Sequence, residues 1–207
     1  MTRDELLRRR PVWEAMSDLF LDTETRWSVP YVARRCAESG YDDEVLERIF
    51  WAEVFPEGIE NLLQVAGDWG MLKLDEPALI KRANHGSIPW LTRRAHGWMV
   101  QDSWLATRQV TGWLRELPGD ERLLRVRALD LLGRRFFENP GSASLMVTPE
   151  RVAEVRAVIE EEWKRYEPLC RAMAGKDEDA DACAAAVEKL MSPSPRGGEG
   201  RGEGQHP

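Results

Sequence analysis

The sequence contains few cysteines and no long apolar run, and each shortage argues against a class of protein. Cys36, Cys170 and Cys183 are far apart and form no Cys-x-x-Cys pair, so neither a zinc site nor a disulfide framework is expected. No apolar run approaches the roughly 18 residues of a membrane-spanning helix. The first residues are basic but lack the apolar stretch of a secretory signal. We therefore expect a cytoplasmic protein with reduced thiols and no membrane partner.

Lysine is also scarce, since 5 of the 29 basic residues are Lys and 24 are Arg. This bias is typical of GC-rich coding sequence and points to a bacterial source. The net charge is −7, but residues 85–147 carry +3, while 1–84 carry −6 and 148–191 carry −4. An acidic chain with a basic middle argues against nucleic-acid binding and is compatible with a charged protein partner.

Helical periodicity dominates the pattern. Apolar residues recur three and four positions apart through most of the 207 residues, and no convincing alternating strand is present. We predict an all-α fold, a compact array of about eight helices. The composition favours a helical domain over 1–84, then a second helical domain or an extension of the first over 85–191. Residues 192–207 hold Pro, Gly, Ser and charge without apolar side chains, which predicts a disordered tail.

Proline and glycine indicate several helix ends. Pro11 suits the first turn of a helix, Gly40 is expected to end the next one, and Pro56 to end the third. The longest helix is predicted over 148–174, and a last helix over 177–191.

The stretch LFLDTE, residues 19–24, resembles the first motif of proofreading-type exonucleases, in which an Asp and a Glu two residues apart hold two divalent metals. In those enzymes the pair lies on a strand and faces one side. The residues before Asp22 have a helical period here, and side chains two apart on a helix do not face each other. A metal-dependent hydrolase that uses Asp22 and Glu24 is therefore the alternative function and not the favoured one.

Three longer blocks carry a better resemblance. They are RRPVWEAMSDLFLDTE (9–24), SGYDDEVLERIFWAEVFP (39–56) and NLLQVAGDW (61–69). In this order they are similar to a family of small uncharacterised bacterial proteins, over about residues 8–80. The resemblance implies a domain of unknown function and assigns no catalytic residue.

Tryptophan and arginine supply the candidate binding residues. Nine tryptophans are several times the usual share, and we expect most of them in the core, with one or two left for recognition. The predicted helix that begins at Asp120 is basic and amphipathic, which is typical of a solvated face or of a site for an acidic partner. The candidate partner-binding residues are Trp98, Trp104, Arg122, Arg125, Arg127, Arg134 and Arg135.

No set of residues is assigned as catalytic, cofactor-binding or metal-binding, and an enzyme is less expected than a binding protein. The favoured function is a protein–protein interaction module, such as an antagonist, an immunity-type protein or a regulator. Its expected partner is another protein.

Overall fold

The computed structural model describes residues 1–21, 28–63, 74–85, 89–137 and 147–173, with the backbone alone for 134–137. All regular structure in these residues is helical, which confirms the predicted all-α class. The helices are α1 (Arg3–Ser17), α2 (Val29–Glu38), α3 (Asp43–Arg48), α4 (Phe55–Leu63), α5 (Glu76–His85), α6 (Trp90–His96), α7 (Trp98–Arg115), α8 (Gly119–Phe137), α9 (Val152–Glu161) and α10 (Trp163–Met173). Shorter helical turns are η1 (Asp18–Phe20), η3 (Ile49–Val54) and η4 (Pro149–Arg151).

Several predictions concern residues beyond this part of the chain. Cys183, the helix expected over 177–191 and the tail over 192–207 lie outside the described residues, and so do Asp22 and Glu24 of the hydrolase hypothesis. None of the described helices is both long enough and apolar enough to cross a lipid bilayer.

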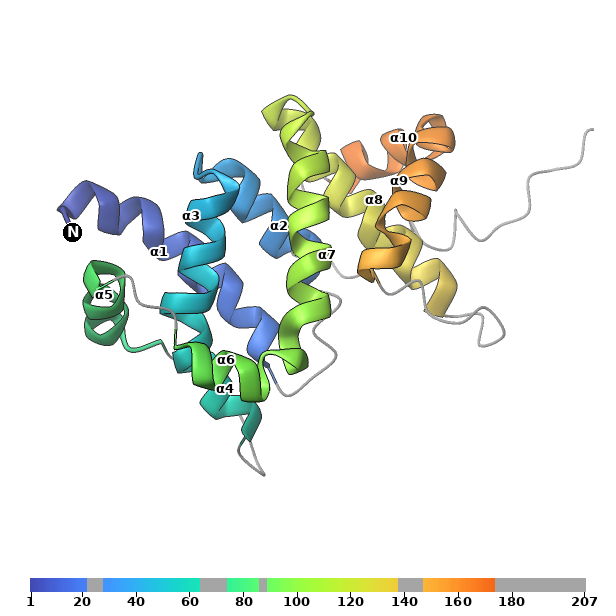
Figure 1. Cartoon of the computed structure of the whole chain (residues 1–207). Helices are drawn as coiled ribbons and strands as arrows, with labels where there is room; N and C mark the ends of the chain where they lie inside the picture. The colour runs from blue at the N-terminus through green and yellow to red at the C-terminus, as the bar shows by residue number, and fades with distance from the viewer. Residues whose placement is uncertain (22–27, 64–73, 86–88, 138–146, 174–207) are drawn as a thin grey trace, which may run out of the picture.

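Helix α7 lies in the centre of the molecule, with α1 to α6 on one side and α8 to α10 on the other (Figure 1). It packs along α2, while α10 and α9 pack against α8. One cluster of buried apolar side chains extends through both sides. The predicted division near residue 85 stays a prediction.

Pro11 lies inside α1 and not in its first turn, contrary to the prediction. A proline within a helix leaves the carbonyl four residues earlier without its donor. That carbonyl belongs to Leu7, which is exposed like Pro11, so water can serve this group and the helix continues.

Pro56 does not end a helix either. Helix α3 continues through η3, a π-helical turn, into α4, and the N–H of Phe55 donates to the carbonyl of Phe50 five residues earlier. In a regular α-helix the ring of Pro56 would clash with the carbonyl four residues earlier. The carbonyl in question belongs to Ala52, inside the wider π turn that ends at Val54, and this turn gives the ring room, so the chain remains helical.

One predicted helix end is confirmed, and one predicted helix is divided. Gly40 follows α2 with a φ of 71°, a left-handed conformation that favours glycine. The helix expected over 148–174 is interrupted at Glu162, whose φ of −88° and ψ of 11° are not helical. The interruption lets α10 begin at Trp163, whose ring lies under a guanidinium from α8.

The described part of the LFLDTE block is held by α4. The ring of Phe20 packs over Gly58, where an added Cβ would lie 2.4 Å from the ring carbon Cγ. The side chain of Asn61 donates to the carbonyl of Phe20 at 2.9 Å. These contacts keep residues 18–20 in the helical turn η1, so the helical period predicted before Asp22 is confirmed.

Candidate functional site

Two of the candidate arginines of α8 are used inside the molecule. Arg125 pairs with Glu160 of α9 at 3.0 Å, and its guanidinium lies 3.3 Å from the ring centroid of Trp163. Arg127 donates to the carbonyl of Met173 at 2.6 Å. Both side chains are buried and join α8 to α9 and α10, so they are not available for a surface contact.

The remaining candidates of α8 differ in position. Arg122 donates from Nε to the carbonyl of Leu114 at 3.0 Å, near the C-terminal end of α7. The side chains of Arg134 and Arg135 lie outside the described residues. The structure therefore does not bring the five arginines together as one exposed face in the part that it describes.

The tryptophans divide as expected into a core group and a small exposed group. Trp104 belongs to the core, where it is 2% exposed and stacks on Phe50 with 4.2 Å between the ring centroids. It is therefore not accessible to a partner. Trp13, Trp51 and Trp113 are also buried, Trp163 is partly buried, Trp90 and Trp98 are exposed, and Trp27 and Trp69 lie outside the described residues.

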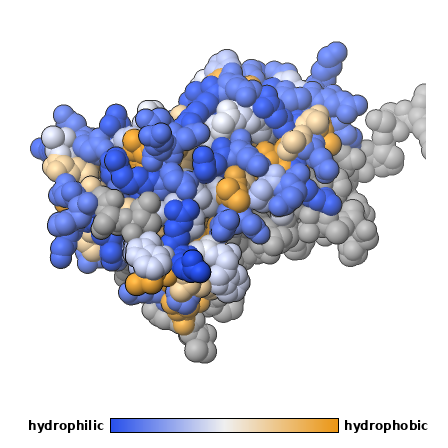
Figure 2. Space-filling view, in the orientation of Figure 1, coloured by the Kyte–Doolittle hydropathy of each residue, from blue (hydrophilic) through white to orange (hydrophobic). Residues whose placement is uncertain are grey.

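The two exposed tryptophans form one surface. Trp90 is 65% exposed, Leu91 is 65% exposed and Trp98 is 72% exposed. Together with Arg93 and Arg94 we call these residues the tryptophan–arginine surface. Figure 1 shows α6 at the foot of α7, and Figure 2 shows pale and orange surface beside deep blue in that place. Apolar and cationic side chains therefore share one exposed edge of the molecule.

The alignment of this surface depends on a glycine. Trp90, Arg94 and Trp98 follow one another at intervals of four residues, although α6 ends before Gly97 and α7 begins after it. The N–H of Gly97 donates to the carbonyl oxygen of Arg93 at 2.7 Å. A Cβ at Gly97 would lie 2.4 Å from that same oxygen. Only glycine allows the two helices to meet this closely.

A hollow of about 570 Å³ lies within the tryptophan–arginine surface. It is lined by Trp51, Trp90, Arg93, Arg94, Gly97, Trp98 and Gln101. The hollow is open to solvent, and its lining combines three indoles with two guanidinium groups and an amide, so it can contact both apolar and polar groups of a partner.

Glu47 of α3 holds the base of the hollow. Its carboxylate accepts hydrogen bonds from the indole N–H groups of Trp51 at 2.9 Å and Trp104 at 2.8 Å. It also pairs with Arg93 at 3.5 Å and with Arg108 at 3.3 Å. The guanidinium of Arg93 lies 4.1 Å from the ring centroid of Trp51. These contacts fix the base before any partner arrives.

Arg94 differs from its neighbour Arg93. It is exposed, and it makes no ion pair with any other described residue. Residues 89–101 contain no Asp or Glu at all. The described lining of the hollow therefore holds two arginines and no carboxylate, although exposed Asp102 follows Gln101 directly.

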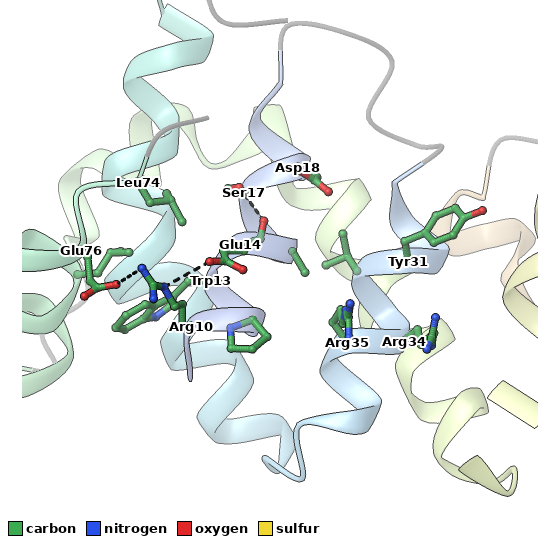
Figure 3. A pocket seen from close by; sticks show the side chains of 14 residues that line it. Arg10, Trp13, Glu14, Ser17, Asp18, Tyr31, Arg34, Arg35, Leu74 and Glu76 are labelled. Carbon is green, nitrogen blue, oxygen red and sulfur yellow. Dashed lines mark hydrogen bonds and ion pairs between the residues drawn. The ribbon is translucent and has the colours of Figure 1, made fainter. Parts of the chain in front are cut away.

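A second hollow, a groove of about 580 Å³, lies over α1 between α2 and the start of α5. Figure 3 shows Arg10 between Glu14 and Glu76, and Asp18 on the side nearer to Tyr31. Arg10 pairs with Glu76 at 2.9 Å and with Glu14 at 3.4 Å. Burial raises the pKa of the half-buried Asp18 above its ordinary value of 3.8. Charges of both signs line this groove, and its three arginines, Arg10, Arg34 and Arg35, are already paired.

The raised pKa of Asp18 leads to a stability prediction. A carboxyl group whose pKa is higher in the folded state favours folding below its unfolded pKa, and this contribution is lost as the pH rises through the folded pKa. We expect Asp18→Asn to increase the free energy of unfolding at neutral pH, and the gain to disappear below about pH 3.8. Urea unfolding at both pH values measures this, with exposed Glu14→Gln on the preceding helix α1 as control. A gain that persists at acidic pH would contradict the explanation.

The two described cysteines are not reactive groups. Burial raises the pKa of the Cys36 and Cys170 thiols to about 12, so both are protonated at neutral pH. Within the described ranges, no group of three His, Cys, Asp or Glu side chains is placed to hold a metal ion.

The blocks that carry the family resemblance build a buried polar cluster. Arg9 and Glu53 form an ion pair at the contact between α1 and the π turn, and Glu53 also accepts the indole N–H of Trp13 at 2.7 Å. Glu5 binds Arg9 at 2.8 Å and accepts the hydroxyl of Tyr41 at 3.0 Å. Burial alone would lower the pKa of Arg9. The negative charge of Glu53 and the hydrogen bonds that Arg9 makes raise this pKa above its ordinary value. These residues therefore hold the first helices together.

The family itself is established by comparison. A family model described as a domain of unknown function, DUF7079, matches residues 7–110, and the chain belongs to this family. The predicted resemblance is thereby confirmed. No curated protein and no solved structure matches the chain. The match includes all of α6 and most of α7, so the tryptophan–arginine surface lies within it, whereas the arginines of α8 lie beyond it.

Proposed function

We propose that this protein is a protein–protein interaction module that binds another protein through the tryptophan–arginine surface. The exposure of Trp90, Leu91 and Trp98 within nine residues carries this proposal. Tryptophan is costly to leave in water, and it is enriched among the residues that dominate binding energy at interfaces.

The rigid base of the surface supports the same function. Glu47 and Arg93 are already held by their own contacts, so little side-chain freedom is lost there when a partner binds. Trp90 and Trp98 add large areas at a low cost in side-chain entropy. A module of this kind acts by covering a surface of its partner, as an antagonist, an immunity-type protein or a regulator does.

The partner is found by photo-cross-linking. A photoreactive amino acid is placed at Leu91 of the full chain, and in a matched variant at Leu7, which is also exposed but lies on α1. A protein that is cross-linked from position 91 and not from position 7 is then purified for affinity measurements. Cross-linking from both positions alike would show that contact is not specific to this surface.

Binding to that purified partner should depend on Trp98. A residue that dominates an interface contributes at least about 2 kcal/mol, so Trp98→Ala is expected to raise the Kd by roughly 30-fold or more. Leu7→Ala should leave the Kd unchanged, and circular dichroism checks that both variants are folded. An unchanged Kd for Trp98→Ala would overturn the proposed function.

A further inference from the structure

We infer that the partner presents an acidic segment with one large apolar side chain. This side chain inserts into the hollow between Trp90 and Trp98, and a neighbouring carboxylate pairs with Arg94. The inference rests on the proposed function, because it specifies the chemistry of the partner at the same surface.

Charge is the first argument. Arg93 is partly neutralised by Glu47, whereas Arg94 makes no ion pair within the described part of the chain. No described carboxylate lines the hollow; exposed Asp102 follows Gln101 on α7 but is not part of the lining. An exposed guanidinium without an ion pair among the described residues, next to a hollow lined by indoles, is complementary to a carboxylate beside an apolar side chain.

Shape is the second argument. Trp51, Trp90 and Trp98 all line the hollow, so an aliphatic or aromatic side chain placed there contacts aromatic rings. Gln101 lies at its edge on α7, and its amide can both donate to and accept from the backbone of a segment anchored there.

The same features disfavour other occupants. A second copy that packed hollow against hollow would bring Arg93 and Arg94 towards their equivalents, and such like charges are repulsive. A net charge of −7 opposes binding to an anionic lipid surface. Single-stranded nucleic acid needs a cationic groove along its backbone, and residues 89–101 supply only Arg93 and Arg94.

The test uses the full chain and short fluorescent peptides. Each peptide carries one Leu, Phe, Trp or Ala in a Gly-Ser background, flanked by either Glu or Lys. We expect the Glu-flanked peptides with a large apolar residue to bind at least about tenfold more tightly than the Ala and Lys-flanked peptides, in fluorescence anisotropy at low salt. High salt should weaken this binding, because the ion pair is exposed.

A charge exchange makes the test specific. Arg94→Glu should lose the Glu-flanked peptides and gain the Lys-flanked ones, and Trp98→Ala should lose both. The matched control is Arg151→Glu in η4, because Arg151 is also exposed and makes no ion pair with another described residue. This control should bind the peptides as the unchanged protein does.

The outcomes separate the inference from the proposed function. The inference is overturned if Trp98→Ala weakens binding of the cross-linked partner while Arg94→Glu does not, and the proposed function then stands. If Trp98→Ala has no effect on partner or peptide, both fail. Three other results would overturn the acidic partner. They are binding of anionic vesicles that depends on Trp98, binding of a single-stranded oligonucleotide that depends on Trp98, and a dimer in light scattering that Trp98→Ala dissociates. Each would identify the lipid surface, the nucleic acid or the second copy as the occupant.

Discussion

Glu53→Gln is expected to lower the free energy of unfolding by roughly 3 kcal/mol. Glu53 is 1% exposed and pairs with Arg9, which is itself buried. Removing one member of a buried ion pair leaves the other charge without compensation, which costs about 3–5 kcal/mol. We place this variant at the lower end, because Glu5 still binds Arg9 and the new amide can accept the N–H of Trp13.

The measurement is urea unfolding followed by circular dichroism at neutral pH. Glu57→Gln on α4 is the control, because Glu57 pairs with Arg82 closer to solvent and such a pair contributes about 0–1 kcal/mol. The double variant Arg9→Met and Glu53→Gln should recover much of the loss, since no buried charge remains in the pair and the amide still accepts the N–H of Trp13. Equal losses for Glu53→Gln and Glu57→Gln would contradict the assigned role of the pair.

Trp104→Ala is expected to lower the free energy of unfolding by about 3–5 kcal/mol, the usual cost of removing a large aromatic side chain from a core. The indole stacks on Phe50 with an angle of 2° between the rings, and it connects α7 to η3. Its N–H donates to Glu47, so this substitution also removes one of the contacts that hold the base of the tryptophan–arginine surface.

Trp104→Phe separates the two roles. A phenyl ring keeps most of the packing but has no N–H, so we expect a loss of about 1 kcal/mol from the missing hydrogen bond, plus a smaller loss of packing. Thermal unfolding of both variants measures the difference. If Trp104→Ala costs no more than Trp104→Phe, packing against Phe50 is not the main contribution of this residue.

The candidate site was only partly predictable from the sequence. Trp98 was among the candidate residues and lies on the exposed surface, whereas Trp104, six residues further along α7, is in the core. Both have an apolar ring with one polar N–H, so composition cannot distinguish them. The interval of four that joins Trp90, Arg94 and Trp98 was visible in the sequence, and it is the signal that could have identified the surface earlier.

The positions of the arginines of α8 were less predictable from the sequence than those of the tryptophans. The spacing in α8 predicts a basic face, and an isolated amphipathic helix would present that face to solvent. In the folded chain α9 and α10 pack against α8. One carboxylate and one indole from them bind Arg125, and one carbonyl accepts from Arg127. The partners of those arginines lie 35 and 46 residues away along the chain, beyond the reach of any local pattern.

The sequence by itself determined the helical class, the stop at Gly40 and the family resemblance, because periodicity, glycine conformation and residue order are local properties. Tertiary structure alone decided that the chain continues as a helix through Pro56, that Arg9 and Glu53 meet, and which tryptophans remain in solvent. A helical period shows that a face is apolar, but the elements that cover this face are set by packing between distant segments. None of the described helices covers Trp90 or Trp98, and their exposure makes this surface the candidate site.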